Sequence, residues 1–198
     1  SVSVNINSKY YARSTDIRTG RVSNNFYTEG YETGNIFDIF GDATISSAMV
    51  HVNSETTPGA KLFAKLYEAN GQGNFTLLSL SDTLTLPSLT NDQVFRVRLR
   101  NPTLLQAGKT YLLTAGSLGS ATFPGLVMGT SGISEIFTSY FKADNSSTWY
   151  SFTVAPMVKM NFESVLGSGT PRGLGWGRGG APRGGVGVAL WGALVKTS

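Results

Sequence analysis

Apolar and polar residues alternate one by one along most of this chain, and this period of two constrains its fold more than any other feature. The clearest case is the segment Phe-Arg-Val-Arg-Leu-Arg at residues 95–100. Successive side chains on a β-strand point to opposite faces, so such a segment is typical of a strand with one face buried. The segment predicts a half-buried β-strand.

Further segments of this kind follow one another up to residue 164, separated by turn signals such as Pro58-Gly59 and Asn70-Gly71. They are residues 1–7, 36–40, 47–52, 61–67, 76–86, 110–115, 123–128, 136–141, 148–154 and 157–162. No stretch shows the periodicity of a helix. Short strands at this spacing predict one all-β domain over residues 1–164, a two-sheet antiparallel sandwich of the jelly-roll-like kind.

The amino-acid composition suggests where the protein is located and excludes chemistry that depends on cysteine. Charged residues make up only 14% of the chain, against about 25% in average proteins. A polar surface of Ser, Thr, Asn and Gly favours a secreted or cell-surface protein. The absence of cysteine excludes disulfides and thiol catalysis. No apolar run reaches 18 residues, so we expect no transmembrane helix.

Residues 165–198 differ sharply from the preceding domain and are expected to be an extended Gly/Arg-rich tail. They contain 11 of the 24 glycines and no acidic residue, and they carry the whole net charge of +4. Their Arg-Gly steps are similar to RNA-binding RGG segments. Only three steps are present, and a secreted domain seldom meets RNA, so nucleic acid is not the expected partner.

The tail ends in a short apolar stretch that can add a strand to an open sheet edge. Its main apolar residues are Val186, Val188, Leu190 and Trp191. We expect this stretch to contact a neighbouring subunit, with residues 165–185 as a spacer.

A family resemblance agrees with the predicted fold. The segments at 36–48, 59–68 and 99–111, followed by Pro-Met-Val-Lys-Met-Asn-Phe at 156–162, are similar to jelly-roll modules of secreted Bacteroidota surface proteins exported by the type IX pathway. The resemblance covers about residues 20–163 and leaves the tail unmatched. It implies a module that accompanies adhesins and carbohydrate-active enzymes, and its motifs set turns and core contacts without implying catalytic residues.

Sequence motifs give no support for an enzyme. His51 is the only histidine, so a hydrolase triad or a histidine-rich metal site would depend on it alone. Neither a nucleophile elbow nor a phosphate-binding loop is present in residues 1–164. No cofactor is expected except a structural calcium ion. Its candidate ligands are Glu29 and Glu32, which flank Gly30 in an expected loop, and Asp38 and Asp42, which follow closely in the sequence.

Several residues are candidates for contacts with partners. Arg96, Arg98 and Arg100 share one strand face, where acids of a neighbouring strand, a partner subunit or an anionic glycan would balance their charge. Phe63 and Tyr67 lie on the face opposite the apolar Leu62, Ala64 and Leu66. Trp149 and Tyr150 are candidates for glycan binding. The candidate glycosylation sites are Asn74, Asn145 and Thr83.

These observations predict a non-enzymatic extracellular structural or adhesive subunit. It would self-associate as a homo-oligomer or polymer, into a filament, sheath or surface layer, with the tail on a neighbouring subunit. Two alternatives stay open at this stage. One is a carbohydrate-binding module of a larger secreted protein, and the other is a viral or phage jelly-roll shell protein.

Overall fold

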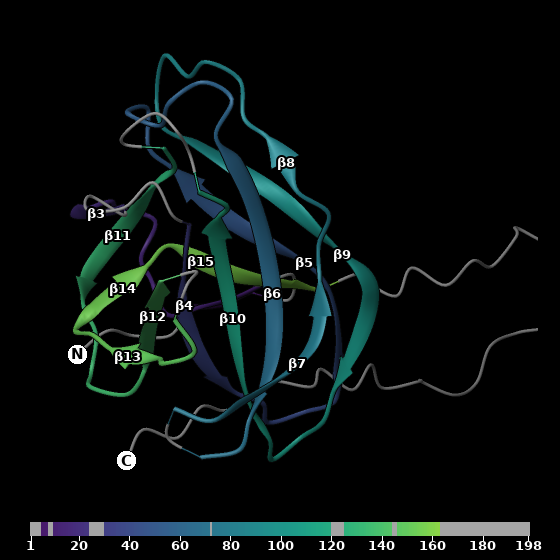
Figure 1. Cartoon of the computed structure of the whole chain (residues 1–198). Helices are drawn as coiled ribbons and strands as arrows, with labels where there is room; N and C mark the ends of the chain where they lie inside the picture. Colours follow the sequence, from purple (N-terminus) through teal and green to yellow (C-terminus); the bar gives the residue numbers. More distant parts are fainter. Residues whose placement is uncertain are drawn as a thin grey trace, which may run out of the picture.

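A computed structural model describes residues 5–7, 10–23, 30–71, 73–119, 125–143 and 146–162 of the chain. The regular structure in this part consists of β-strands (Figure 1). They are β1 Asn5–Asn7, β2 Tyr10–Ala12, β3 Gly20–Ser23, β4 Tyr31–Asp38, β5 Ala43–Val52, β6 Lys61–Ala69, β7 Phe75–Leu80, β8 Leu84–Thr85, β9 Gln93–Leu105, β10 Thr110–Ser117, β11 Val127–Ile133, β12 Ser139–Ala143, β13 Tyr150–Ser151, β14 Val154–Pro156 and β15 Val158–Phe162. In the same residues, no helix is long and apolar enough to cross a membrane.

The strands form two antiparallel sheets that pack face to face. The seven-stranded sheet has the order β13-β12-β4-β10-β6-β7, with β8 paired to β6. The eight-stranded sheet has the order β1-β2-β15-β5-β11-β14, with β3 beside β11 and β9 beside β5. Figure 1 shows β10 and β6 running across β15. From β4 to β6 and again from β9 to β12, successive strands alternate between the sheets, and the predicted β-sandwich is confirmed.

The core lies between the two sheets and consists of the inward faces of their strands. The stripe Leu62, Ala64 and Leu66 of β6 is fully buried there, as the alternation in the sequence predicts. On the opposite sheet, Val97 and Leu99 of β9 also enter the core. Burial of apolar area at about 25 cal/mol per Å² is the main force that holds the sheets together.

Two buried polar side chains also tie the sheets together. Asn35 of β4 donates from Nδ2 to the carbonyl oxygens of Pro156 at 2.8 Å and Val158 at 3.3 Å. The Oδ1 atom of Asn35 accepts a hydrogen bond from the Ser139 hydroxyl at 3.0 Å. Because Asn35 is fully buried, these bonds satisfy groups that water cannot reach. Asn35 therefore links β4 to the β14–β15 turn of the other sheet.

Tyr31, the first residue of β4, makes a second cross-link. Its hydroxyl donates to the carbonyl oxygens of Leu126 at 3.1 Å and Val22 at 3.2 Å. Burial raises the pKa of Tyr31 above its ordinary value, so the hydroxyl keeps its proton at neutral pH. The tyrosine can therefore act as a hydrogen-bond donor inside the core.

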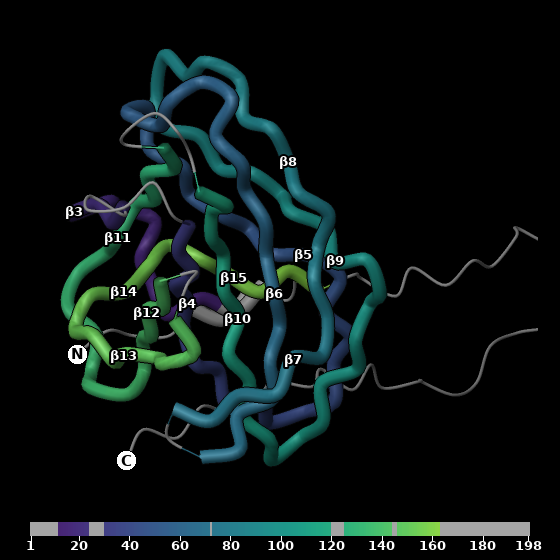
Figure 2. The backbone as a smooth tube through the Cα atoms, in the orientation of Figure 1, coloured from purple at the N-terminus to yellow at the C-terminus, as the bar shows by residue number. Residues whose placement is uncertain are grey.

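One side of the sandwich is closed by contact between strands of different sheets. Strands β7 and β9 run side by side there (Figure 2). The Ser79 hydroxyl donates to the carbonyl oxygen of Asn101 at 3.0 Å, and Ser81 forms an isolated bridge with Leu99. Exposed sheet edges are templates for unwanted pairing, and this contact covers part of two edges.

The strand boundaries differ from the sequence prediction in the regions with weak alternation. Strand β11 begins at Val127, where the sequence suggests a strand over 123–128, and the segment 148–154 is split between β13 and β14. The short strands β2 and β3 were not predicted. The tail 165–198 lies outside the described residues.

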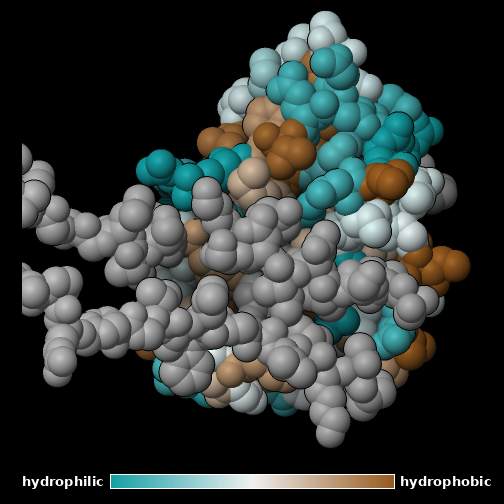
Figure 3. Space-filling view, turned by 180° about the vertical axis from the view of Figure 1, so that it is seen from behind, coloured by the Kyte–Doolittle hydropathy of each residue, from teal (hydrophilic) through white to brown (hydrophobic). Residues whose placement is uncertain are grey.

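The surface seen from behind gives few clues to function. The upper end of the molecule is mainly hydrophilic in this view, with separate hydrophobic patches (Figure 3). Single exposed apolar residues are normal on folded proteins. These separate patches do not by themselves mark a binding site.

Candidate functional site on the outer face of the seven-stranded sheet

The outer face of the seven-stranded sheet is unusually well buried for a face turned away from the core. Strands β4, β10 and β6 lie side by side, with Ile36 opposite Leu112 and Leu112 opposite Tyr67. Leu112 is fully buried, and the exposed fraction of Tyr67 is 6%. The alternation that places Leu66 in the main core turns Tyr67 to this second face, so the predicted orientation is confirmed.

Aromatic rings cover the lower half of this face. The Tyr67 ring meets the Trp149 ring edge to face, with 5.6 Å between centroids. Phe75 contacts Trp149 at 5.3 Å and Tyr140 at 4.9 Å, again with the rings nearly perpendicular. Such edge-to-face pairs contribute about 0.5–1.5 kcal/mol beyond the area they bury. The four rings form a second hydrophobic cluster with Ile36 and Leu112.

A pocket of about 200 Å³ opens beside these rings. Its walls are the side chains and backbone of Ile36, Ala69, Gly71, Phe75, Thr110, Phe137 and Tyr140. Thr110 adds a polar group, and its hydroxyl donates to Asp38 at 2.7 Å. The pocket is smaller than the roughly 300–1,000 Å³ of sites for drug-sized ligands. It has room for one small ring, held by apolar walls and a polar edge.

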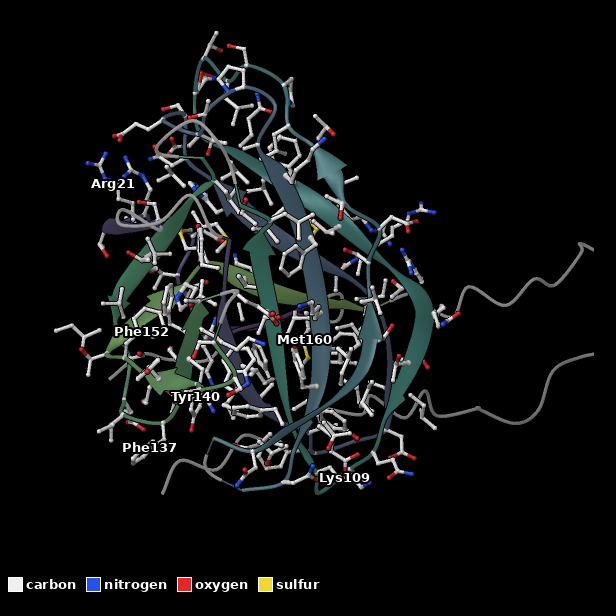
Figure 4. The ribbon with its side chains drawn as sticks, in the orientation of Figure 1. Arg21, Lys109, Phe137, Tyr140, Phe152 and Met160 are labelled. Carbon is white, nitrogen blue, oxygen red and sulfur yellow. The ribbon has the colours of Figure 1, made fainter. Side chains whose placement is uncertain are left out.

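Phe137 has a strained backbone at the rim of this pocket. Its φ of 64° lies in the left-handed region, which a bulky side chain rarely adopts. The backbone amide of Phe137 donates to the Ser151 hydroxyl at 2.7 Å, which helps to hold this conformation. The ring is 43% exposed, so core packing does not explain its position. Figure 4 shows Phe137 below Tyr140 at the lower end of the sheet.

A buried carboxylate occupies the upper half of the same face. Glu32 of β4 is only 2% exposed. Its Oε1 atom accepts hydrogen bonds from the hydroxyls of Tyr67 at 2.7 Å and Thr114 at 2.6 Å. Its Oε2 atom accepts a hydrogen bond from the Lys65 ammonium at 2.8 Å. Removing a carboxylate from water is costly, and these charge-assisted bonds offset that cost.

Two of the groups that bind Glu32, the Lys65 ammonium and the Tyr67 hydroxyl, are affected by nearby aromatic rings and by burial. The Lys65 ammonium lies 4.6 Å from the centre of the Phe63 ring. Phe63 is only 5% exposed, although it lies on the outer face as predicted. Burial, followed by the neighbouring Glu32 charge, raises the pKa of Tyr67. The Tyr67 hydroxyl therefore stays protonated and donates to Glu32 at neutral pH.

The described candidates for calcium ligands each contact a different group. Glu32 was expected in a loop, and this expectation was wrong, since Glu32 lies in β4 and binds Lys65. Asp42 accepts a hydrogen bond from the backbone amide of Ala107, while Asp38 binds Thr110. In the described part of the chain, no three acidic or histidine side chains gather to hold a metal ion. Glu29 lies outside that part.

The predicted arginine row lies on the outer face of the eight-stranded sheet, away from the aromatic cluster. Arg96, Arg98 and Arg100 are exposed on β9, and this orientation is confirmed. Arg100 pairs with Asp82 at 2.7 Å, and Arg96 donates to the Ser47 hydroxyl at 2.9 Å. The exposed ion pair between Arg100 and Asp82 contributes at most about 1 kcal/mol.

His51 lies on this second outer face and is half-buried. Its Nε2 atom is 3.9 Å from Asp92, which also pairs with Arg18 at 2.7 Å. Burial lowers the pKa of His51 in spite of the nearby Asp92 charge. The imidazole is therefore mainly neutral at pH 7, as suits a structural role.

The other candidate residues can be placed as follows. Trp149 belongs to the aromatic cluster and Tyr150 is 58% exposed on β13, while Asn74 and Thr83 are exposed. Asn145 lies outside the described residues, as do Val186, Val188, Leu190 and Trp191. The glycosylation and tail-contact hypotheses stay predictions.

Comparison with known proteins does not assign this site. Neither a scan against protein-family models nor a search of curated proteins finds a match to the chain.

Proposed function

We propose that this chain is a non-enzymatic binding module that recognises a carbohydrate on the outer face of its seven-stranded sheet. The observation that carries the proposal is the position of Phe137, whose half-exposed ring lines a small pocket in spite of backbone strain. Strain of about 1–3 kcal/mol at a non-glycine residue is typical of functional sites. An aromatic residue whose strained backbone places it at a pocket is a reason to expect a ligand.

The chemistry of the pocket suits a sugar ring. A sugar has apolar C–H faces and polar hydroxyl edges, so it needs flat apolar walls and a few hydrogen-bonding groups. Phe75, Phe137 and Tyr140 supply the walls, and the pair Thr110–Asp38 supplies polar atoms at the edge. The volume of about 200 Å³ fits one ring and leaves the rest of an oligosaccharide on the surface.

A glycan array screened with the full chain tests this proposal. We expect a defined set of glycans to bind, and Phe137→Ala to weaken that binding by about tenfold or more, as truncation of an aromatic contact commonly does. Phe40→Ala is the matched control, because Phe40 is 42% exposed but does not line the pocket. Absence of binding to every glycan, or equal loss in both variants, would contradict the proposal.

Self-association is a second candidate function, and a different observation favours it. Ile133 and Ile136 lie on or beside the β11–β12 loop with exposed fractions of 77% and 64%. Exposed apolar residues that gather in one loop are typical of protein contacts. We expect the Ile133→Ser, Ile136→Ser double variant to sediment as a smaller species than the wild-type chain. Identical sedimentation of the two proteins would count against self-association through this loop.

A further inference from the structure

Among the described residues, the cluster around Glu32 contains one more positive charge than negative charges. One carboxylate, Glu32, faces two ammonium groups, those of Lys65 and Lys142, so the net charge of these three groups is +1. Lys65 makes the short contact, at 2.8 Å. The Lys142 ammonium lies 3.9 Å from the same carboxylate oxygen, which is too long for a hydrogen bond.

Lys142 is nevertheless held in a defined position. Its ammonium lies 4.7 Å from the centre of the Trp149 ring, and its side chain is 19% exposed. A cation over an aromatic face is attracted by about 0.5–2 kcal/mol. An ammonium has three donors, and no described residue accepts a hydrogen bond from Lys142. The side chain is thus positioned, partly desolvated and able to bind an external anion.

This ammonium lies on the same surface as the proposed sugar pocket. Tyr140 and Lys142 are two residues apart on β12, so they share a face at a spacing of about 7 Å. The rings of Trp149, Phe75 and Tyr140 form a continuous path from the lysine to the pocket. A ligand that fills the pocket can therefore extend along these rings to Lys142.

We propose that the ligand is an acidic sugar whose carboxylate or sulfate group pairs with Lys142 beside Trp149. This inference rests on the proposed function and names the class of glycan that the module takes. An anionic group there would neutralise the excess charge of the Glu32 cluster and accept the free donors of the lysine. Because Lys142 is partly buried, the interaction is screened less by salt than one at an exposed side chain.

Titration calorimetry of the full chain with three probes tests the inference. The probes are trigalacturonate for a carboxylate, a sulfated galactan oligosaccharide for a sulfate, and neutral galactose oligomers. We expect at least one acidic probe to bind about tenfold more tightly than the neutral one, as a charge-assisted hydrogen bond allows. Lys142→Gln is expected to remove this preference, whereas Lys142→Arg is expected to retain it.

The matched control is Arg98→Gln, which removes an exposed positive charge from the other sheet and should leave the preference unchanged. Equal affinity of the wild-type chain for acidic and neutral probes would overturn the inference but leave glycan binding intact. Equal losses in Lys142→Gln and Arg98→Gln would also overturn it, because the effect would then follow net charge. Failure of all probes and of the glycan array would overturn the proposed function itself.

Discussion

Replacement of Glu32 by leucine is expected to lower the free energy of unfolding by about 3–5 kcal/mol. The carboxylate is buried and accepts bonds from Tyr67, Thr114 and Lys65. Leucine would leave the Tyr67 hydroxyl and the Lys65 ammonium without their acceptor, and the Lys142 ammonium without its counter-charge, in a place that water reaches poorly. Removal of one partner from a buried ion pair leaves the other charge buried and unpaired. This cost is larger than the stability that the intact pair provides.

Urea unfolding of the wild-type chain and the variant measures this effect. Glu55→Leu is the matched control, since Glu55 also pairs with a basic residue, Arg21, but its side chain is 53% exposed. We expect the control to change the free energy by no more than about 1 kcal/mol. If Glu32→Leu cost no more than Glu55→Leu, the Glu32 cluster would not be the organising feature of this face.

Replacement of Asn35 by leucine is expected to cost about 2–4 kcal/mol of stability. The change removes the donor for the carbonyl oxygens of Pro156 and Val158 and the acceptor for the Ser139 hydroxyl. Each unsatisfied buried group costs roughly 1–3 kcal/mol, and the gain in apolar volume offsets part of the loss. The midpoint of urea unfolding should fall accordingly.

The control for this substitution is Asn101→Leu on the exposed part of β9. A surface change of this kind typically stays within about 0.5 kcal/mol. A similar small effect at Asn35 would mean that the two sheets are held together without the polar link between β4 and the β14–β15 turn.

Period-two alternation allowed the sequence to predict much of the fold. Side-chain direction follows directly from position along a strand, so the exposed arginines of β9 and the outer-face positions of Phe63 and Tyr67 could be predicted. Short or irregular strands such as β2, β3 and β13 have too few residues for a pattern, which explains why their boundaries were missed or misplaced.

The candidate site could be predicted only in part. Glu32 was placed in a loop because Glu29 and Gly30 precede it, and its partners are 33 to 82 residues away on β6 and β10. The register that joins these strands is not visible in one sequence. Phe137 gave no signal either, since glycine or asparagine normally marks a left-handed position. The pocket depends on both features. Of the candidate residues, Tyr67 and Trp149 lie in the cluster on this face, and their role in binding stays a prediction.

The central claim is that a sugar binds at the pocket formed by Phe75, Phe137 and Tyr140. The most direct measurement is a ¹H–¹³C NMR titration of the full chain, with the aromatic rings and the side chains of β9 assigned and the tightest array ligand added. We expect the largest shift changes at Phe137 and Tyr140, with the rings of Phe75 and Trp149 following. Shifts that concentrate instead on β9 around Arg96 and Arg98, or spread evenly over the molecule, would contradict the claim.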